Sequence, residues 1–131
     1  MIVVDTAAVI DALIGRPAPI GLVERIAGAR ELHAPHLIDV ELLHALRRLV
    51  ASGDIGSDRA DDARRDFADL AIVRYPHGPL ADRMWELRHN VTPYDAAFVA
   101  LAEALDIPLV TCDGRLARSS GHHASVELYQ G

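Results

Sequence analysis

Short, mostly apolar runs with strand character alternate along this chain with longer stretches that have helical periodicity. Such runs are predicted at residues 2–4, 31–34, 72–75, 109–111 and 126–129. Strands of this kind have both faces buried, and strands that alternate with helices form parallel sheets covered on both sides. The pattern therefore predicts an α/β fold, with a mostly parallel central sheet between two layers of helices.

The helices expected between these strands are marked by apolar periodicity and by residues that start or stop helices. They are predicted over residues 7–14, 20–29, 37–51, 57–70, 79–88 and 96–105, with a short helix around Leu116. Asp39 and Ser57 are expected to cap helix starts, as is Thr92, which precedes a proline. In the 37–51 helix a single arc holds the apolar side chains, namely Ile38, Leu42, Leu43, Ala45, Leu46, Leu49 and Val50.

With 131 residues, the chain has the size of one domain, and half of its residues are apolar. No stretch approaches the roughly 18 apolar residues of a membrane helix. The apolar start has no basic residues before it and is interrupted by Asp5 and Asp11, unlike a secretion signal. The single cysteine, Cys112, fits a reducing compartment. We therefore expect a single domain over residues 1–131 in a cytoplasmic protein without a membrane partner.

All 13 basic residues are arginines, because the chain contains no lysine. This composition excludes Schiff-base chemistry, P-loops and receiver-type phospho-acceptor sites, each of which requires a lysine. The net charge of −6 also disfavours binding of nucleic acid over a broad basic surface. Any contact with nucleic acid must therefore depend on a local site.

Four acidic residues are expected at one edge of the sheet. Asp5 and Asp113 follow two of the strands, and the carboxyl ends of parallel strands lie at the same edge. Asp95 lies in the first turn of the helix that leads to the second of these strands, and Glu41 lies near the start of the 37–51 helix. Because both helices begin at that edge, the four carboxylates are predicted to meet in one cleft.

Carboxylates gathered in this way repel each other, so the cluster is stable in its ionised form only with cations among them. Ligation by oxygen alone favours Mg²⁺, or Mn²⁺ as a substitute, over zinc. Mg²⁺ held by a few carboxylates and a substrate phosphate is typical of phosphoryl transfer and phosphodiester hydrolysis. Taken singly, each aspartate could instead be a helix cap, and Glu41 could be a solvated residue paired with Arg48.

Other residues give weaker indications of a site. The seven histidines show no His-Glu-x-x-His spacing, so we expect surface or hydrogen-bonded histidines rather than zinc ligands. Cys112 is expected to be an inert thiol at the end of a buried strand. Met84 and Trp85 are expected in the core or at a dimer contact rather than as a platform for substrate.

Four segments carry a resemblance to a known family: Val3-Val4-Asp5-Thr6, Glu41-Leu42-Leu43-His44-Ala45-Leu46, Tyr94-Asp95-Ala96 and Leu109-Val110-Thr111-Cys112-Asp113-Gly114-Arg115. They resemble PIN domains and, more narrowly, the VapC toxins of bacterial VapBC type II toxin–antitoxin pairs. The resemblance covers nearly the whole chain, and its most specific part is the block from residue 94 to residue 113. It implies a three-layer α/β/α sandwich, a Mg²⁺-dependent endoribonuclease, a homodimer and a VapB-like antitoxin that neutralises the toxin.

The resemblance also maps the family's acidic quartet onto the four residues that edge geometry brings together. Asp5 and Asp95 are expected to be the main ligands of a first Mg²⁺, and Asp113 to complete that site or help hold a second ion. Glu41 is expected to orient the attacking water or to bind the second ion. Thr111 matches a hydroxyl position that the family often has near the metal.

Arginine is expected to assist at this site for reasons of charge. Two Mg²⁺ ions balance four carboxylates and leave the phosphate of bound RNA without a balancing charge. Arg115 closely follows Asp113 and is the best candidate for a phosphate contact, ahead of Arg47 and Arg48.

Alternatives to the nuclease follow from the same sequence. A receiver or a haloacid-dehalogenase-like phosphatase would also place acids at this edge, but the chain lacks lysine, and Asp5 is followed by Thr6-Ala7 rather than by an Asp-x-Asp pattern. A non-catalytic PIN-like binding module is disfavoured because the acidic quartet is complete. Transfer, messenger and ribosomal RNA all fit as targets, because no recognition module is visible.

Overall fold

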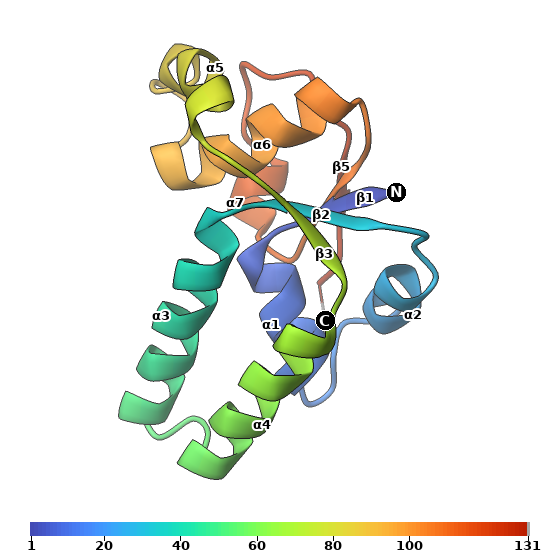
Figure 1. Cartoon of the computed structure of the whole chain (residues 1–131), viewed down its shortest axis with the longest axis vertical. Helices are drawn as coiled ribbons and strands as arrows, with labels where there is room; N and C mark the ends of the chain where they lie inside the picture. The colour runs from blue at the N-terminus through green and yellow to red at the C-terminus, as the bar shows by residue number, and fades with distance from the viewer. Residues whose placement is uncertain (131) are drawn as a thin grey trace.

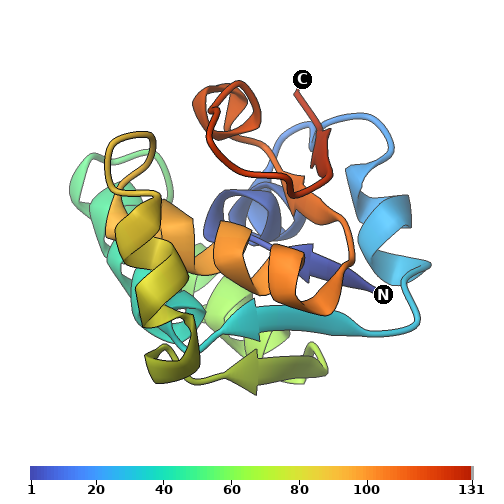
Figure 2. The same ribbon diagram turned by 90° about the horizontal axis from the view of Figure 1, so that it is seen from above.

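The computed structural model describes residues 1–130 and contains a five-stranded sheet in which all neighbouring strands are parallel. The strands are β1 (Ile2–Val4), β2 (Leu32–Pro35), β3 (Ile72–Tyr75), β4 (Leu109–Thr111) and β5 (Val126–Leu128). Their order is β3-β2-β1-β4-β5, which can be followed from bottom to top in Figure 2. The predicted α/β fold with a parallel sheet is confirmed.

Helices cover both faces of this sheet (Figure 1). Below it in that view lie α1 (Thr6–Ile14), α3 (Leu37–Ala51) and α4 (Ser57–Asp69), and above it lie α5 (Ala81–Glu86) and α6 (Pro93–Leu105). Two shorter helices, α2 (Leu22–Ala27) and α7 (Gly114–Ala117), lie in the connections that lead to β2 and β5, and a 3₁₀ turn, η1 (Gly78–Leu80), precedes α5. The arrangement is a three-layer α/β/α sandwich.

The strand order places a topological switch point beside β1. The chain builds β1, β2 and β3 outward in one direction and then returns to pair β4 with the other side of β1. Val3 and Val4 are in register with Leu109 and Val110, and the amide of Asp5 donates a hydrogen bond of 3.2 Å to the carbonyl of Val110. In open parallel sheets, ligands bind outside the carboxyl ends of strands at such a point.

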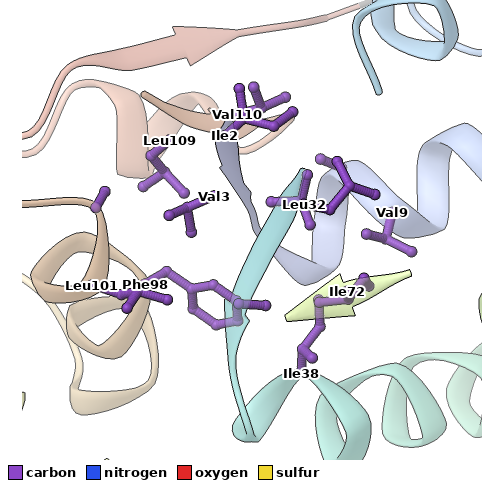
Figure 3. Close-up of a cluster of buried hydrophobic side chains, with 14 of the residues drawn as sticks. Ile2, Val3, Val9, Leu32, Ile38, Ile72, Phe98, Leu101, Leu109 and Val110 are labelled. Atoms are coloured by element: carbon purple, nitrogen blue, oxygen red, sulfur yellow. The ribbon is translucent and has the colours of Figure 1, made fainter. Parts of the chain in front are cut away.

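Aliphatic side chains from the sheet and from both helix layers fill the core. Figure 3 shows Phe98 and Leu101 of α6 on one side of the strands, and Val9 of α1 and Ile38 of α3 on the other. Residues 96–102 of α6 are all buried, because the sheet covers one side of the helix and α5 packs against another. A helix buried all round is held rigidly, and this fixes the position of its first turn. Among residues 1–130, none of the helices combines the length and the apolar character needed to cross a lipid bilayer.

The apolar arc predicted for the 37–51 helix is only partly correct. Ile38, Leu42 and Leu46 are buried along α3, but the side chain of Leu43 is 51% exposed. The buried residues follow one i, i+4 ridge, which is the part of the helix that packs against β2, α1 and α4. Leu43 lies beside this ridge and therefore remains at the surface.

Two predicted helix caps are also wrong. Asp39 does not cap α3, because its two carboxylate oxygens accept hydrogen bonds of 2.8 Å each from Arg74 of β3. The free amide of Leu37 at the start of α3 instead donates to Nε2 of His77, at 3.0 Å. Ser57 is the first residue of α4 rather than its cap, a position held by Gly56. The predicted cap at Thr92 is confirmed, since its hydroxyl accepts from the amide of Asp95.

We expect Leu42→Ala and Leu43→Ala to differ sharply in stability although the residues are adjacent. Leu42 is 1% exposed, so its truncation leaves a cavity and should lower the free energy of unfolding by about 2–5 kcal/mol. Leu43→Ala should change it by less than about 1 kcal/mol. Urea denaturation of the metal-free proteins tests this, and equal losses for the two variants would contradict the orientation of α3.

Candidate active site

Asp5 is a buried carboxyl group at the carboxyl end of the central strand. It is 6% exposed and is the N-cap of α1, where its Oδ1 accepts a hydrogen bond of 2.8 Å from the amide of Ala8. Its Oδ2 accepts a hydrogen bond from the hydroxyl of Thr111. Asp5 is therefore a helix cap, which was the alternative role expected for each aspartate. Its second oxygen, however, is held by a residue from another strand.

Thr111 connects the two strands of the switch point. It is the last residue of β4, is fully buried, and donates to Asp5 while its own oxygen accepts a hydrogen bond of 3.0 Å from the amide of Asp113. One hydroxyl thus orients two of the predicted acidic residues. Thr111 thus contacts two of the predicted ligands, and its place near a metal stays a prediction.

Asp113 begins α7 immediately beyond β4. Its Oδ1 accepts hydrogen bonds from the amides of Arg115 and Leu116, at 2.9 and 3.4 Å, and so caps this short helix. Asp95 lies in the first turn of α6, after the Thr92 cap. The structure therefore gives both residues the local roles expected of acids at helix starts, and it also brings both of them to the edge occupied by Asp5.

Glu41 projects from the second turn of α3 and is tied to α1. Its Oε1 accepts a hydrogen bond of 2.7 Å from the hydroxyl of Thr6, the residue that follows Asp5. No ion pair joins Glu41 to Arg48 in the part of the chain that the structure describes, so the predicted alternative pairing is wrong. This role of Thr6 was not predicted from the sequence, where the available signal was a hydroxyl directly after the first acidic residue.

The electrostatics show that these carboxyl groups lie close enough to influence one another. Burial raises the pKa of Asp5 to about 7, against the lowering effect of its hydrogen bonds, and the charges of Asp95 and Asp113 raise it further. Burial and the charge of Asp113 raise the pKa of Asp95. Burial raises the pKa of Glu41 too, and the charge of Asp95 adds to this effect. The charge of Asp95 thus acts on both Asp5 and Glu41, and the charge of Asp113 acts on both Asp5 and Asp95.

The donor set fits a hard divalent cation. The carboxylates and the hydroxyls beside them offer oxygen alone, which suits Mg²⁺ or Mn²⁺. Within residues 1–130, no three His, Cys, Asp or Glu side chains converge closely enough to enclose one ion. The four acids therefore line an open edge instead of forming a closed cage, and Mg²⁺, which keeps several waters and uses one or two carboxylates, suits such an edge.

Three further predictions concern other residues, two of them near this edge. The positive charge of Arg115 lowers the pKa of Asp95, so Arg115 lies near the acidic residues as predicted. Burial and the neighbouring Asp11 raise the pKa of Cys112 to about 12, which agrees with an inert thiol. Trp85 was expected in the core or at a dimer contact; at 67% exposed it does not lie in the core, and the dimer contact stays a prediction.

We expect Asp5→Asn to stabilise the metal-free protein in a pH-dependent way. The folded chain keeps a proton on Asp5 that the unfolded chain releases above pH about 4, so the free energy of unfolding of the wild type falls between pH 4 and about 7. At about 1.4 kcal/mol per pKa unit, the advantage of Asp5→Asn should grow to about 4 kcal/mol by pH 7 and then level off.

Urea denaturation in a chelating buffer at several pH values measures this advantage. Asp61→Asn, which makes the same substitution at an exposed position of α4, is the control and should show no such trend. A difference between Asp5→Asn and the wild type that does not change from pH 4 to pH 8 would contradict a buried, protonated Asp5.

Comparison with known proteins agrees with this geometry. The family model described as "PIN domain" matches residues 2–121. Ribonuclease VapC1 of Mycobacterium tuberculosis is 47% identical over 127 residues, which is 96% of this chain and 96% of the relative, and Ribonuclease VapC12 of the same organism is 40% identical over 98% of each chain.

The fold of a solved relative agrees as well. The crystal structure of VapBC2 from Rickettsia felis, bound to a DNA fragment from their promoter, aligns with a TM-score of 0.69 at 16% identity. The alignment covers 98% of this chain and 99% of that chain. With a family model matched over most of its length and a relative at 47% identity over 96% of each chain, this chain belongs to the PIN-domain family and, within it, to the VapC group.

Proposed function

We propose that this chain is a Mg²⁺-dependent endoribonuclease that acts in the cytoplasm as the toxin of a toxin–antitoxin pair. The observation that carries the proposal is the buried Asp5 at the switch point, with Asp95, Asp113 and Glu41 lying along the same edge. Relatives named ribonucleases, at 40–47% identity over almost the full length, support RNA as the substrate.

The acidic residues would divide the work of holding the ion. Asp5 and Asp95 are proposed as the main ligands, and Asp113, whose Oδ1 already caps α7, would complete the site or help hold a second ion. Bound Mg²⁺ supplies Lewis acidity and charge neutralisation for hydrolysis of a phosphodiester. Thr111 is a positioning residue, because its hydrogen bonds fix both Asp5 and the backbone of Asp113.

Glu41 is the proposed acceptor of the proton from the attacking water, or the ligand of a second ion. Its pKa is raised by burial and by Asp95, and this makes it a better proton acceptor than an exposed glutamate. The hydrogen bond from Thr6 fixes the orientation of the carboxylate. Arg115 lines the same pocket as Asp95, whose pKa its charge lowers, and is proposed to contact the RNA phosphate.

We expect Asp5→Asn and Asp95→Asn each to lower Mg²⁺-dependent cleavage of RNA by at least about 100-fold. Loss of a residue that merely supports a ligand costs 10- to 100-fold, so loss of a ligand should cost at least as much. Cleavage of total RNA in Mg²⁺ and in chelator measures the effect, with Asp61→Asn as the matched control. Undiminished cleavage by a folded Asp5→Asn protein would refute the proposed roles.

Calorimetric titration with Mn²⁺ distinguishes this proposal from a non-catalytic binding module. The wild-type protein should bind Mn²⁺, and Asp5→Asn should bind it at least about 10-fold more weakly. A binding module has no need of the ion, so absence of Mn²⁺ binding together with absence of cleavage would favour the module.

An antitoxin partner and a homodimer are part of the same proposal. An apolar groove of about 880 Å³ runs between α1 and α3 and begins at Glu41. Val40 and Tyr94 on its rim are 66% and 60% exposed. Exposed apolar side chains beside an acidic edge suit a protein partner that carries basic residues, and a VapB-like antitoxin is proposed to cover this edge.

We expect expression of the chain alone to arrest growth, and co-expression with its cognate antitoxin to restore it. An unrelated small protein expressed in place of the antitoxin is the control and should leave the arrest unchanged. Growth arrest that persists while the antitoxin is tightly bound would contradict inhibition by coverage of the acidic edge.

A further inference from the structure

A second pocket is lined in part by Asp95 and not by Glu41. It has a volume of about 480 Å³ and lies between the α5–α6 connection and α7. Apart from Asp95, its polar lining consists of Arg88, His89, Asn90, Thr92, Arg115 and Ser119. The proposed metal ligand Asp95 therefore lies at the border of a pocket that is otherwise neutral or basic.

The two arginines of this pocket differ from several others in the chain. Arg25, Arg74 and Arg83 each donate two hydrogen bonds to one carboxylate and are thus neutralised. Within residues 1–130, neither Arg88 nor Arg115 forms an ion pair with a carboxylate. In a chain with a net charge of −6, this is a local site that attracts a phosphate group.

Arg88 also connects the pocket to an exposed aromatic ring. Its guanidinium lies 4.5 Å from the ring centre of Trp85, and its Nη1 donates a hydrogen bond of 2.9 Å to the carbonyl of Trp85. Trp85 is 67% exposed although it is the only tryptophan of the chain, and α5 buries none of its residues completely. Figure 1 shows α5 beside α6, the helix whose first turn holds Asp95. A large indole ring is thus held in place by Arg88 and left open to solvent.

We propose that this pocket and Trp85 together bind a nucleotide of single-stranded RNA next to the scissile phosphate. Arg88 and Arg115 contact its phosphate, and its base stacks on the indole of Trp85. Arginines that form no ion pair in the described chain, beside an exposed aromatic ring, match the chemistry of a nucleotide, since basic side chains bind the backbone and aromatic rings stack on any base. An apolar protein segment would leave both arginines without an anionic partner. The inference rests on the proposed function, because it takes the scissile phosphate to lie at the acidic edge.

The single tryptophan allows a direct test of this subsite. The inactive Asp5→Asn protein, in Mg²⁺ buffer, is titrated with a fluorescently labelled single-stranded RNA decamer and, separately, with a base-free polyphosphate. We expect the RNA to quench Trp85 fluorescence and the polyphosphate not to quench it. In the same background, Trp85→Ala should weaken RNA binding by about 5- to 150-fold, which is the effect of losing one stacked base. Trp85→Phe should weaken it less.

Matched variants separate this inference from its alternatives. Ile20→Ala removes another exposed apolar side chain, 96% exposed and outside both pockets, and should leave RNA binding unchanged. Arg88→Gln should weaken binding of both RNA and polyphosphate. Unaltered RNA affinity in both Trp85→Ala and Trp85→Phe would overturn the subsite. So would a result in which these variants lose dimerisation or antitoxin binding instead of RNA binding.

The failure of this inference can be told apart from failure of the proposed function. If wild-type protein cleaves RNA but Trp85 is neither quenched nor needed for binding, the nuclease stands and the subsite is wrong. If RNA quenches Trp85 while no cleavage occurs in Mg²⁺, the pocket binds RNA and the proposed nuclease activity is wrong.

Discussion

Asp5 is a buried carboxyl group whose two oxygens join helix α1 to strand β4, through the amide of Ala8 and the hydroxyl of Thr111. The position is unfavourable for a charge, as its pKa of about 7 indicates, because burial and two neighbouring aspartates disfavour ionisation. Ionisation of Asp5 therefore costs free energy at the carboxyl end of the central strand. A cation would remove the penalty, which gives a physical reason for such a residue at a metal-dependent site.

Sheet topology explains why the other acidic residues gather around Asp5. Since β4 pairs with β1 on the side away from β2, residues more than 100 positions apart in sequence become hydrogen-bonded neighbours. Asp95 lies at this edge because it is in the first turn of the buried helix α6. Glu41 of α3 is held there by the hydrogen bond that it accepts from Thr6. A local cap or contact holds each acid in its position. The acids lie near one another because the parallel strands end at the same edge of the sheet.

The surroundings of the acidic edge are asymmetric. On the side of Glu41, an apolar groove between α1 and α3 suits a protein segment. On the side of Asp95, the lining is polar and carries two arginines without carboxylate partners in the described chain, continued by Trp85. The asymmetry fits the proposals above, in which RNA and an antitoxin would approach the same carboxylates over different surfaces. Two arginines would then bind a phosphate locally despite the net negative charge.

The sequence by itself determined the strands, the alternation with helices and the acidic residues, because these depend on local apolar patterns and on residues that begin helices. Only the tertiary structure decided which neighbours those residues have. Asp39 lies in an apolar arc and was expected to be a cap, but Arg74 on a distant strand binds it instead. Of the two places expected for Trp85, the structure excludes the core, because the side chain is exposed with the guanidinium of Arg88 over its ring. Periodicity records which side of a helix is apolar, whereas the partner of a side chain depends on contacts between segments far apart in the chain.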